Sequence, residues 1–172
     1  PALMEAAHDR WGRAEWSGLF DAAIGLAEDG FEVGPRLARL VARDADRLRR
    51  FGPTRAYFLP GGAPLRAGDT LRNPAYAETL RLMADNGATP FYTGAIADDI
   101  AATVQHADGN PGELRAIDMA VYQVRERPAV CVPYRGYETC GMGPPSSGGV
   151  TVGQILGLLR PFDLASLGPD SA

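Results

Sequence analysis

One stretch of the sequence, from Met142 to Gly149, constrains the fold of this chain more than any other. It consists mainly of two prolines, two serines and two glycines: Pro144, Pro145, Ser146, Ser147, Gly148 and Gly149. The prolines exclude a helix there, the serines can bond to nearby backbone, and the glycines permit dihedral angles that other residues avoid. An apolar helix is predicted directly afterwards, from Val150 to Leu159. We therefore expect a rigid loop that presents backbone N–H groups at a helix start, with both glycines in conformations that a side chain would strain.

A β-hairpin is predicted just before this loop. Four residues of this region stand out as a motif: Tyr134, Arg135, Gly136 and Tyr137. Residues 133–136 have turn chemistry, with a glycine at the last position. Before the turn, residues 122–126 alternate in polarity and residues 130–132 are apolar, and the chain returns over residues 137–140. This is the only β region that the sequence predicts.

Helical periodicity covers much of the remaining sequence. Apolar residues recur at helical spacing in these segments: 16–27, 37–50, 74–83, 96–104 and 114–120. Residues 56–59 are predicted as a short extended piece inside a loop rich in Gly and Pro. Trp11 and Trp16 are expected to anchor the core. The expected fold class is α+β, a mostly helical segment with one β-hairpin.

Composition excludes several classes of function. A length of 172 residues favours one domain. The net charge of −4 gives no basic field for nucleic acid, and no apolar run reaches the ~20 residues of a membrane span. All seventeen basic residues are arginine, so no lysine can act as a nucleophile. The arginines of residues 39–50 interleave with Asp44 and Asp46, which indicates a solvated, salt-bridged helix face in which Asp46 is spaced to pair with Arg50.

A phosphate-binding loop is the sharpest alternative for the Gly-rich stretch. Gly143 and Gly148 have the spacing of the P-loop glycines. The Lys and Ser/Thr that must follow are replaced by Gly149 and Val150, so nucleotide binding by that route is not predicted.

The acidic and histidine residues do not predict a catalytic or metal site. Asp98 and Asp99 are neighbours on a predicted helix, so their carboxylates point apart. His8 and His106 each lack an acidic or thiol partner at useful spacing. We therefore assign no catalytic, substrate-binding or metal-ligating residue to this chain, and no cofactor.

The chain has two cysteines, Cys131 and Cys140, whose spacing fits neither a zinc site nor a C-x-x-C redox pair. They could approach one another if they lie on adjacent strands of the hairpin. We expect buried free thiols instead, and the redox compartment stays undecided.

These motifs resemble those of the gamma-glutamyltranspeptidase family, whose heavy subunit carries Y-R-G-Y and then M-P-P-P-S-S-G-G before a helix. Gly143 replaces the first of the three prolines in that motif. Residues 8–33 resemble the family segment that ends in A-I-x-L-A-x-x-G-F, and residues 91–97 resemble its F-Y-x-G-x-I-A. Residues 154–164 resemble its Q-I-L…y-D-l, while residues 167–168 and 171–172 resemble the start of its next helix.

The resemblance implies a chemistry that this chain does not contain. In the family, an amino-terminal threonine, freed when a precursor cleaves itself into heavy and light subunits, transfers the gamma-glutamyl group of glutathione or a related amide. That threonine, the L-S-S-M-S-P oxyanion motif and the R-E-x-A-P substrate motif have no counterpart in this sequence. We expect no activity from the chain alone.

The same resemblance places the chain in a larger protein. Residues 1–172 are interpreted as one heavy-subunit segment, truncated at both ends, that joins an αββα sandwich of the Ntn-hydrolase type. Its implied partner is the light subunit of the same precursor, its implied substrate is glutathione-like, and the family favours a periplasmic or extracellular location.

Two other functions stay open: a related acylase acting on glutaryl or cephalosporin-type amides, and a purely structural or interaction module. For residues 144–149 and 134–137 we prefer a structural role near the light subunit to direct contact with substrate.

Overall fold

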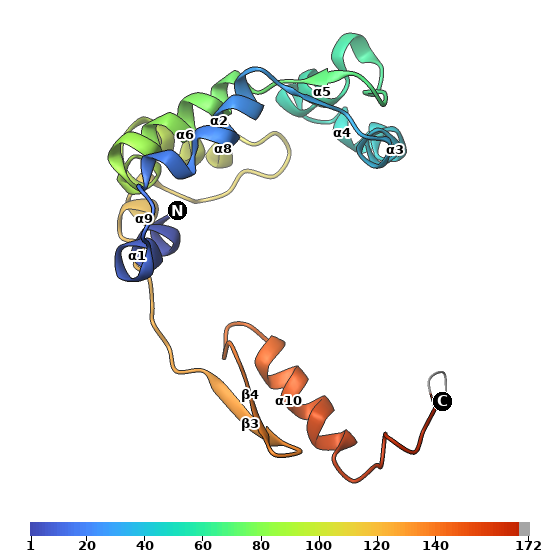
Figure 1. Ribbon diagram of the computed structural model, residues 1–172. Helices are drawn as coiled ribbons and strands as arrows, with labels where there is room; N and C mark the ends of the chain where they lie inside the picture. The colour runs from blue at the N-terminus through green and yellow to red at the C-terminus, as the bar shows by residue number, and fades with distance from the viewer. Residues whose placement is uncertain (169–172) are drawn as a thin grey trace. The chain divides into compact units, whose positions relative to one another are not determined.

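Helix α6 (Pro74–Asn86) is the longest helix in the part of the chain that the computed structural model describes, residues 1–168 (Figure 1). It begins as predicted, because the side chain of Asn73 accepts a hydrogen bond of 3.0 Å from the backbone N–H of Tyr76. Pro74 occupies the first turn, where a missing N–H costs nothing. Ala77, Leu80 and Met83 form its buried face.

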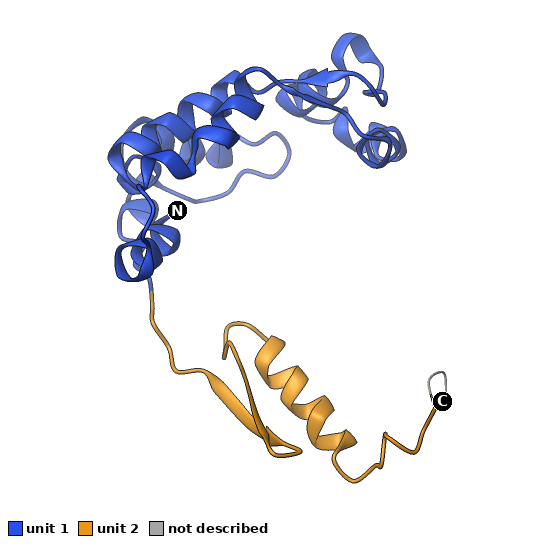
Figure 2. Cartoon of the chain, in the orientation of Figure 1, with its two compact units in different colours: residues 1–124 blue, residues 125–172 orange. Residues whose placement is uncertain are grey.

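The chain divides into two compact units, residues 1–124 and residues 125–172 (Figure 2). The other elements of unit 1, in order, are α1 (Ala2–Trp11), η1 (Ser17–Leu19), α2 (Asp21–Glu28), β1 (Phe31–Glu32), α3 (Pro35–Arg43), α4 (Ala45–Leu48), α5 (Gly52–Phe58), η2 (Pro60–Gly62), β2 (Thr70–Leu71), α7 (Thr89–Tyr92), α8 (Ala95–Gln105) and α9 (Ala116–Ala120). Helices α2 and α7 pack on α6, and α8 packs on α7 and α9. The indole N–H of Trp16 donates a hydrogen bond of 2.9 Å to the carbonyl of Met83 and so ties η1 to α6.

A second apolar cluster lies beside the short antiparallel pair β1–β2, in which Phe31 pairs with Leu71 and Glu32 with Thr70. Its buried members are Val33, Val41, Ala45, Leu59, Leu65 and Leu71. The pair was not predicted, since strands of two residues leave no alternating pattern in the sequence. Residues 1–168 therefore contain two antiparallel pairs where one hairpin was expected.

Two predicted helices are interrupted. The segment 16–27 contains η1 and then α2, because Ser17 and Gly18 are weak helix formers at its start. The segment 37–50 breaks at Asp44, whose dihedral angles of φ −99° and ψ 12° separate α3 from α4. The carboxylate of Asp44 forms ion pairs with Arg43 and Arg47. Such local side-chain interactions favour non-helical backbone at aspartate, so the helix breaks there.

The arginine-rich face is salt-bridged and exposed, as predicted. The Asp44 carboxylate lies 3.2 Å from the guanidinium of Arg47, and Asp46 lies 2.6 Å from that of Arg49. The expected partner of Asp46 was Arg50, so the pair has i,i+3 spacing where i,i+4 was predicted.

Three further local predictions were wrong. Residues 56–58 belong to helix α5 and are not extended, since Pro53 in the first turn of α5 favours a helix start. Residues 122–126 form no strand, and β3 begins only after Pro128, which has no N–H to give a sheet. Trp11 is 68% exposed and lies under the Arg10 guanidinium, so it does not anchor the core.

The described residues of unit 2, 125–168, form a hairpin and one helix: β3 (Val130–Tyr134), β4 (Tyr137–Gly141) and α10 (Gly148–Leu159). The strands pair antiparallel, from Val130 opposite Gly141 to Tyr134 opposite Tyr137. Helix α10 packs on both strands (Figure 1). The helix and the strands at residues 130–132 and 137–140 lie where the sequence predicted them.

The fold class is α+β, as expected. Helices α6, α8 and α9 and the hairpin confirm the main periodicities. Among residues 1–168, no helix is both long and apolar enough to cross a membrane. Residues 171–172, whose likeness to a following helix start was noted above, lie outside the described residues.

Candidate functional site

The hairpin turn is built by the four residues Tyr134, Arg135, Gly136 and Tyr137. Arg135 (φ 50°) and Gly136 (φ 86°) are its two central residues, and positive φ at both is the combination of a type I′ turn. The turn is therefore centred one residue later than the predicted segment 133–136. Tyr134 and Tyr137 form the pair that closes it.

Arg135 links this turn to the chain beyond α10. Its guanidinium lies 5.1 Å from the centre of the Tyr134 ring, within cation–π distance. The same group donates a hydrogen bond of 2.5 Å to the carbonyl of Phe162. The side chain thus fastens the tip of the hairpin to the segment after the helix, which is a structural task.

The Pro-Ser-Gly loop between β4 and α10 is held by its own hydrogen bonds. The N–H of Ser146 donates to the carbonyl of Gly143 at 3.1 Å. The Ser146 hydroxyl oxygen accepts from the N–H of Gly148 at 3.3 Å, and the Ser147 carbonyl accepts from Thr151 at 2.8 Å. Ser147 stands at the N-cap of α10, yet its side chain makes no capping bond.

The two loop glycines do not occupy the strained conformations that were expected, because neither has a positive φ. Gly149 is required for a different reason, the closeness of its surroundings. A Cβ built on Gly149 would lie 2.6 Å from the Met142 carbonyl oxygen and 2.9 Å from the carbonyl carbon of Gly141. A Cβ on Gly148 would meet only the Ser146 hydroxyl oxygen, at 3.6 Å. The constraint is close backbone packing at Gly149 alone.

The start of α10 therefore presses directly on the end of β4. One turn further along, Gly153 continues this contact, since a Cβ there would lie 2.9 Å from Val132 Cγ1. Helix α10 turns Gly149 and Gly153 to the hairpin. Its side chains Leu156 and Leu159 are half-buried, and four other apolar side chains are exposed: Val150, Val152, Ile155 and Leu158. The described part of the chain offers those side chains no partner layer.

A small pocket of about 120 Å³ lies where the helix meets the strand. Its lining consists of Thr139, Cys140, Gly141, Gly148, Gly149, Val152 and Gly153. The lining contains a hydroxyl but no histidine or carboxylate that could act as a base. Of the ten residues proposed for the structural loop, the structure brings Gly148 and Gly149 to this pocket and places the turn residues at the opposite end of the hairpin.

The acid and base candidates of unit 1 have local structural partners or face solvent. His8 and His106 each bond through one ring nitrogen to a backbone carbonyl, those of Ala14 and Ala102. Asp98 and Asp99 are exposed on α8. No group of these residues gathers around a shared point among the described residues.

Cys131 and Cys140 form a disulfide, so the expectation of buried free thiols was wrong. They face each other across the hairpin with their Cα atoms 4.1 Å apart, close to the spacing of a non-hydrogen-bonded antiparallel pair. Both are exposed. In the chain-entropy picture, closing a loop of this length stabilises the folded hairpin by about 3 kcal/mol.

The sequence contained a signal for this disulfide. Cys131 and Cys140 are equally distant from the Arg135–Gly136 turn, so a two-residue hairpin places them opposite one another. The turn was predicted one residue too early, at residues 133–136. About that position the two cysteines are not equally spaced, so their pairing was not predicted.

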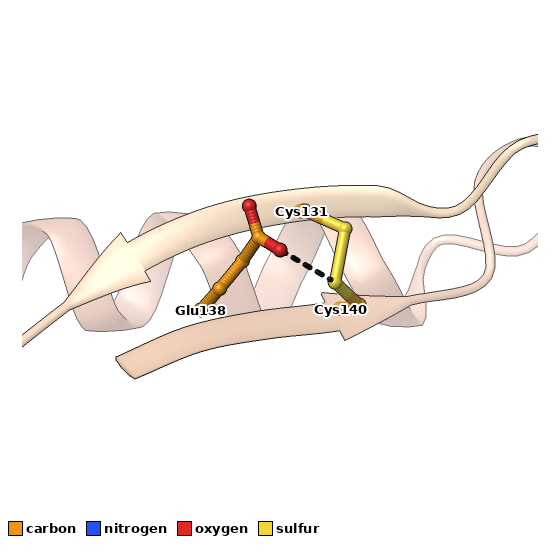
Figure 3. Close-up of side chains that lie close together, drawn as sticks. All are labelled: Cys131, Glu138 and Cys140. Carbon is orange, nitrogen blue, oxygen red and sulfur yellow. Dashed lines mark hydrogen bonds between the residues drawn. A yellow bond between two sulfur atoms is a disulfide. The ribbon is translucent and has the colours of Figure 1, made fainter. Parts of the chain in front are cut away.

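Glu138 lies beside the disulfide (Figure 3). Its carboxylate oxygen Oε2 is 3.9 Å from Cys140 Sγ, a contact that involves no shared proton because the sulfur of a disulfide carries none. Ligand atoms of Cys131, Glu138 and Cys140 all lie within 4.8 Å of one another. Both sulfurs are bonded to each other, so no thiolate is present to bind a metal.

Comparison with known proteins identifies the family of this helical α+β chain. Residues 1–172 match the Gamma-glutamyltranspeptidase family along their whole length. The chain belongs to the gamma-glutamyltranspeptidase family.

Similar proteins include hydrolases and acylases. The chain is 38% identical to the glutathione hydrolase proenzyme of Escherichia coli over 99% of its own length and 29% of that protein. It is 37% identical to the acylase ACY 1 proenzyme of a Pseudomonas species over 92% of its length and 28% of that protein. The crystal structure of Helicobacter pylori gamma-glutamyltranspeptidase superimposes with a TM-score of 0.90 at 34% identity, over 98% of this chain and 48% of that one. The chain thus spans less than a third of these curated relatives, and both of them are named as proenzymes.

The packing at Gly149 predicts opposite effects for two neighbouring substitutions. Gly149→Ala places a methyl group 2.6 Å from a backbone oxygen and should destabilise the protein by about 1–3 kcal/mol, the usual cost of overpacking. Gly148→Ala is the matched control: it has room and should be neutral or stabilising by up to about 1 kcal/mol, because alanine favours helix. Thermal unfolding of the two variants beside the parent protein measures both effects. A Gly148→Ala variant less stable than Gly149→Ala would contradict this packing account.

Proposed function

We propose that this chain is part of the heavy subunit of a gamma-glutamyltranspeptidase, and that the complete protein transfers or hydrolyses the gamma-glutamyl group of glutathione and related amides. The observation that carries the proposal is the match over 99% of the chain to a protein named glutathione hydrolase, within a family match that covers every residue. In this proposal residues 1–172 are one continuous segment of a longer heavy subunit.

The catalytic nucleophile belongs to the light subunit in this proposal. An amino-terminal threonine can supply both the attacking hydroxyl and, through its own amine, the base that activates it. A terminal amine of that kind is created only when a precursor is cut, which accords with the proenzyme names of the relatives. The chain itself then needs no base, and the pocket at Gly149 has none in its lining.

The contribution of this chain is to support the light subunit. We define the outer face of α10 as Ile155 and Leu158, which are 49% and 73% exposed. A helix that exposes such side chains gains stability when another apolar layer covers them. Because the chain spans only 29% of the Escherichia coli relative, most of the protein that could cover this face lies outside it. The light subunit is the occupant that we assign to it.

An acylase is the second candidate, favoured by the nearly equal identity of 37% to acylase ACY 1. The two activities differ at one group of the substrate. A gamma-glutamyl amide carries an α-ammonium that a glutaryl amide lacks, so a site that pairs this ammonium should reject the glutaryl compound strongly.

The assay that separates these functions uses two anilides that differ only in that ammonium. The complete, matured protein should hydrolyse gamma-glutamyl-p-nitroanilide with a kcat/KM at least about 100-fold above that for glutaryl-p-nitroanilide. The amino-terminal residue of its smaller fragment should be threonine. A preference for the glutaryl compound would establish the acylase, and no turnover of either by a cleaved protein would leave a structural module.

The structural role of the loop predicts that its hydroxyls are dispensable for turnover. Ser147→Ala removes a side chain that makes no capping bond, and Ser146→Ala removes only a weak acceptor at 3.3 Å. Both variants should mature, and their kcat should stay within about threefold of the parent value. Precursor cleavage on gels and steady-state kinetics of the matured enzyme measure the two steps separately. A Ser147→Ala variant that matures normally yet loses about 100-fold or more in kcat, as expected for a lost oxyanion donor, would make the loop catalytic.

A further inference from the structure

Positive charge is concentrated in one segment of unit 1. Residues 35–66 carry eight of the seventeen arginines and only two acidic residues, so the segment has a net charge of +6 in a chain whose net charge is −4. It contains helices α3, α4 and α5, which follow one another in contact (Figure 1). All eight arginines are exposed. Charges of one sign gathered in this way produce a strong local field.

Most of these arginines have no acidic partner. Asp44 forms ion pairs with Arg43 and Arg47, and Asp46 forms one with Arg49. Within residues 1–168 the remaining five form no ion pair, and we call them the arginine surface: Arg36, Arg39, Arg50, Arg55 and Arg66. Guanidinium groups stay charged at every ordinary pH, so five positive charges are left for an anion from elsewhere.

The arginine surface has a fixed backbone beneath it. Arg36 and Arg39 lie one turn apart on the same face of α3, and Val41, on the opposite face, is buried in the apolar cluster beside β1–β2. The N–H of Arg66 donates a hydrogen bond of 2.7 Å to the carboxylate of Asp69, which holds the turn after η2. The backbone that carries these charges therefore does not have to be ordered when an anion binds.

Two members of the arginine surface line a pocket of about 440 Å³. Arg39 contributes from α3 and Arg66 from the turn after η2. The rest of the lining is aliphatic: Ala38, Ala42, Ala63, Pro64, Leu65 and Ala67. Two cations in an otherwise aliphatic lining suit a molecule that joins an anion to a hydrocarbon chain.

An exposed aromatic side chain lies in the same segment. Phe51 directly follows Arg49 and Arg50 and is 55% exposed. It is the one large apolar side chain of residues 35–66 that is exposed. A phenylalanine flanked by arginines is a combination that binds at a bilayer surface, with the ring at the boundary of the acyl chains and the cations on the headgroups.

The rest of the complete protein could cover the arginine surface only at a high cost. A guanidinium that leaves water without meeting an acidic group loses more hydration free energy than its packing returns. Five of them would each need a carboxylate. The segment also contains neither strand of the hairpin, the element that is expected to join the αββα sandwich. The surface therefore stays in water or meets a partner that brings negative charge.

We propose that the arginine surface docks on a membrane that contains anionic phospholipid. Arginine binds phosphate oxygens through two N–H groups at once. A phospholipid brings both chemistries that the segment requires, a phosphate for the guanidinium groups and aliphatic carbon for Phe51 and for the pocket at Arg39 and Arg66. Docking is independent of the reaction catalysed, so this proposal goes beyond the proposed function and does not rest on it.

Single-stranded nucleic acid is the other polyanion that arginines and an aromatic ring can bind. Such sites stack successive bases on several rings. Residues 35–66 expose only one ring, that of Phe51, and the lining of the pocket is aliphatic. These observations favour lipid, and an oligonucleotide becomes one arm of the test.

The test measures flotation of the complete protein with lipid vesicles. One set of vesicles contains phosphatidylcholine alone, and the other an equal mixture of phosphatidylcholine and phosphatidylglycerol. The protein should float with the mixed vesicles and stay behind with the neutral ones. Raising the salt concentration from about 0.1 M to about 1 M shortens the screening length from about 10 Å to about 3 Å and should release most of the bound protein.

Variants assign the binding to named residues. Each arginine of the surface should strengthen binding about fivefold, so Arg39→Gln should weaken it about fivefold and Arg39→Gln/Arg66→Gln about 25-fold. Phe51→Ala should weaken it about fivefold, because the apolar area that the ring buries in lipid is lost. Arg13→Gln is the matched control, an equal loss of one charge at an exposed arginine of unit 1 outside residues 35–66, and it should leave binding within about twofold of the parent value.

Thermal unfolding of the complete protein shows whether these arginines are already paired. The variants remove exposed side chains, so each should unfold within about 2 °C of the parent. A parent protein that does not float, together with an Arg39→Gln/Arg66→Gln variant that unfolds several degrees lower, would overturn the proposal, because the rest of the protein would then supply the partners.

Three other results would also overturn it: equal flotation with neutral and mixed vesicles, an Arg39→Gln/Arg66→Gln variant that binds like the parent, or binding of a single-stranded oligonucleotide without binding to either kind of vesicle. None of these readouts uses gamma-glutamyl turnover, so failure of the docking surface and failure of the proposed function are observed separately.

Discussion

The backbone of Gly149 lies against the carbonyl of Met142 and the carbonyl carbon of Gly141, with no space for a side-chain carbon between them. This contact sets the distance between the first turn of α10 and the last residue of β4. The glycine at 153 continues the close approach along the helix, against Val132. The position of the helix on the hairpin depends on these small residues, because any larger group at 149 must push backbone away from backbone.

Once the helix is placed in this way, the rest of unit 2 follows. Arg135 joins the hairpin tip to Phe162 at the far end of the helix, so the two elements are held at both ends. The disulfide holds the two strands together near the end that meets the loop. With Gly149 and Gly153 against the hairpin, α10 presents Ile155 and Leu158 outward. A rigid support with an exposed apolar face suits a subunit whose partner carries the catalysis, which is the role we propose for it.

The sequence predicted the elements that obey a clear periodicity and missed those set by spatial neighbours. The start of helix α6 was predicted from Asn73 and Pro74, and the hairpin from its apolar strands and its turn glycine. The pair β1–β2 was missed because two-residue strands 39 positions apart have no local pattern. The break at Asp44 arises from side-chain pairs with Arg43 and Arg47 that compete with helix propagation.

The loop at residues 144–149 was selected from the sequence because its glycines were expected to adopt unusual dihedral angles, and the structure gives a different reason. The Pro-Ser-Gly motif and the turn residues were singled out as a structural feature near the light subunit, and that role stays a prediction. Their glycines were expected to need unusual dihedral angles, whereas Gly149 needs only the absence of a side chain. Whether Gly148 or Gly149 tolerates a side chain depends on which atoms of β4 lie opposite it, and the sequence alone does not show those neighbours. The pairing of Cys131 with Cys140 depends likewise on the register of the two strands. A turn predicted one residue too early gives the wrong register, so the two cysteines were not expected to lie opposite each other.

Native-state hydrogen exchange tests most directly whether hairpin and helix form one unit. A two-stranded hairpin and a helix of twelve residues are each only marginally stable alone in water. If the glycine contact makes them interdependent, the protected amides of β3, β4 and α10 should open with one common free energy, equal within about 0.5 kcal/mol. An α10 whose amides exchange by a separate opening, several kcal/mol lower in free energy while the hairpin amides stay protected, would contradict the account.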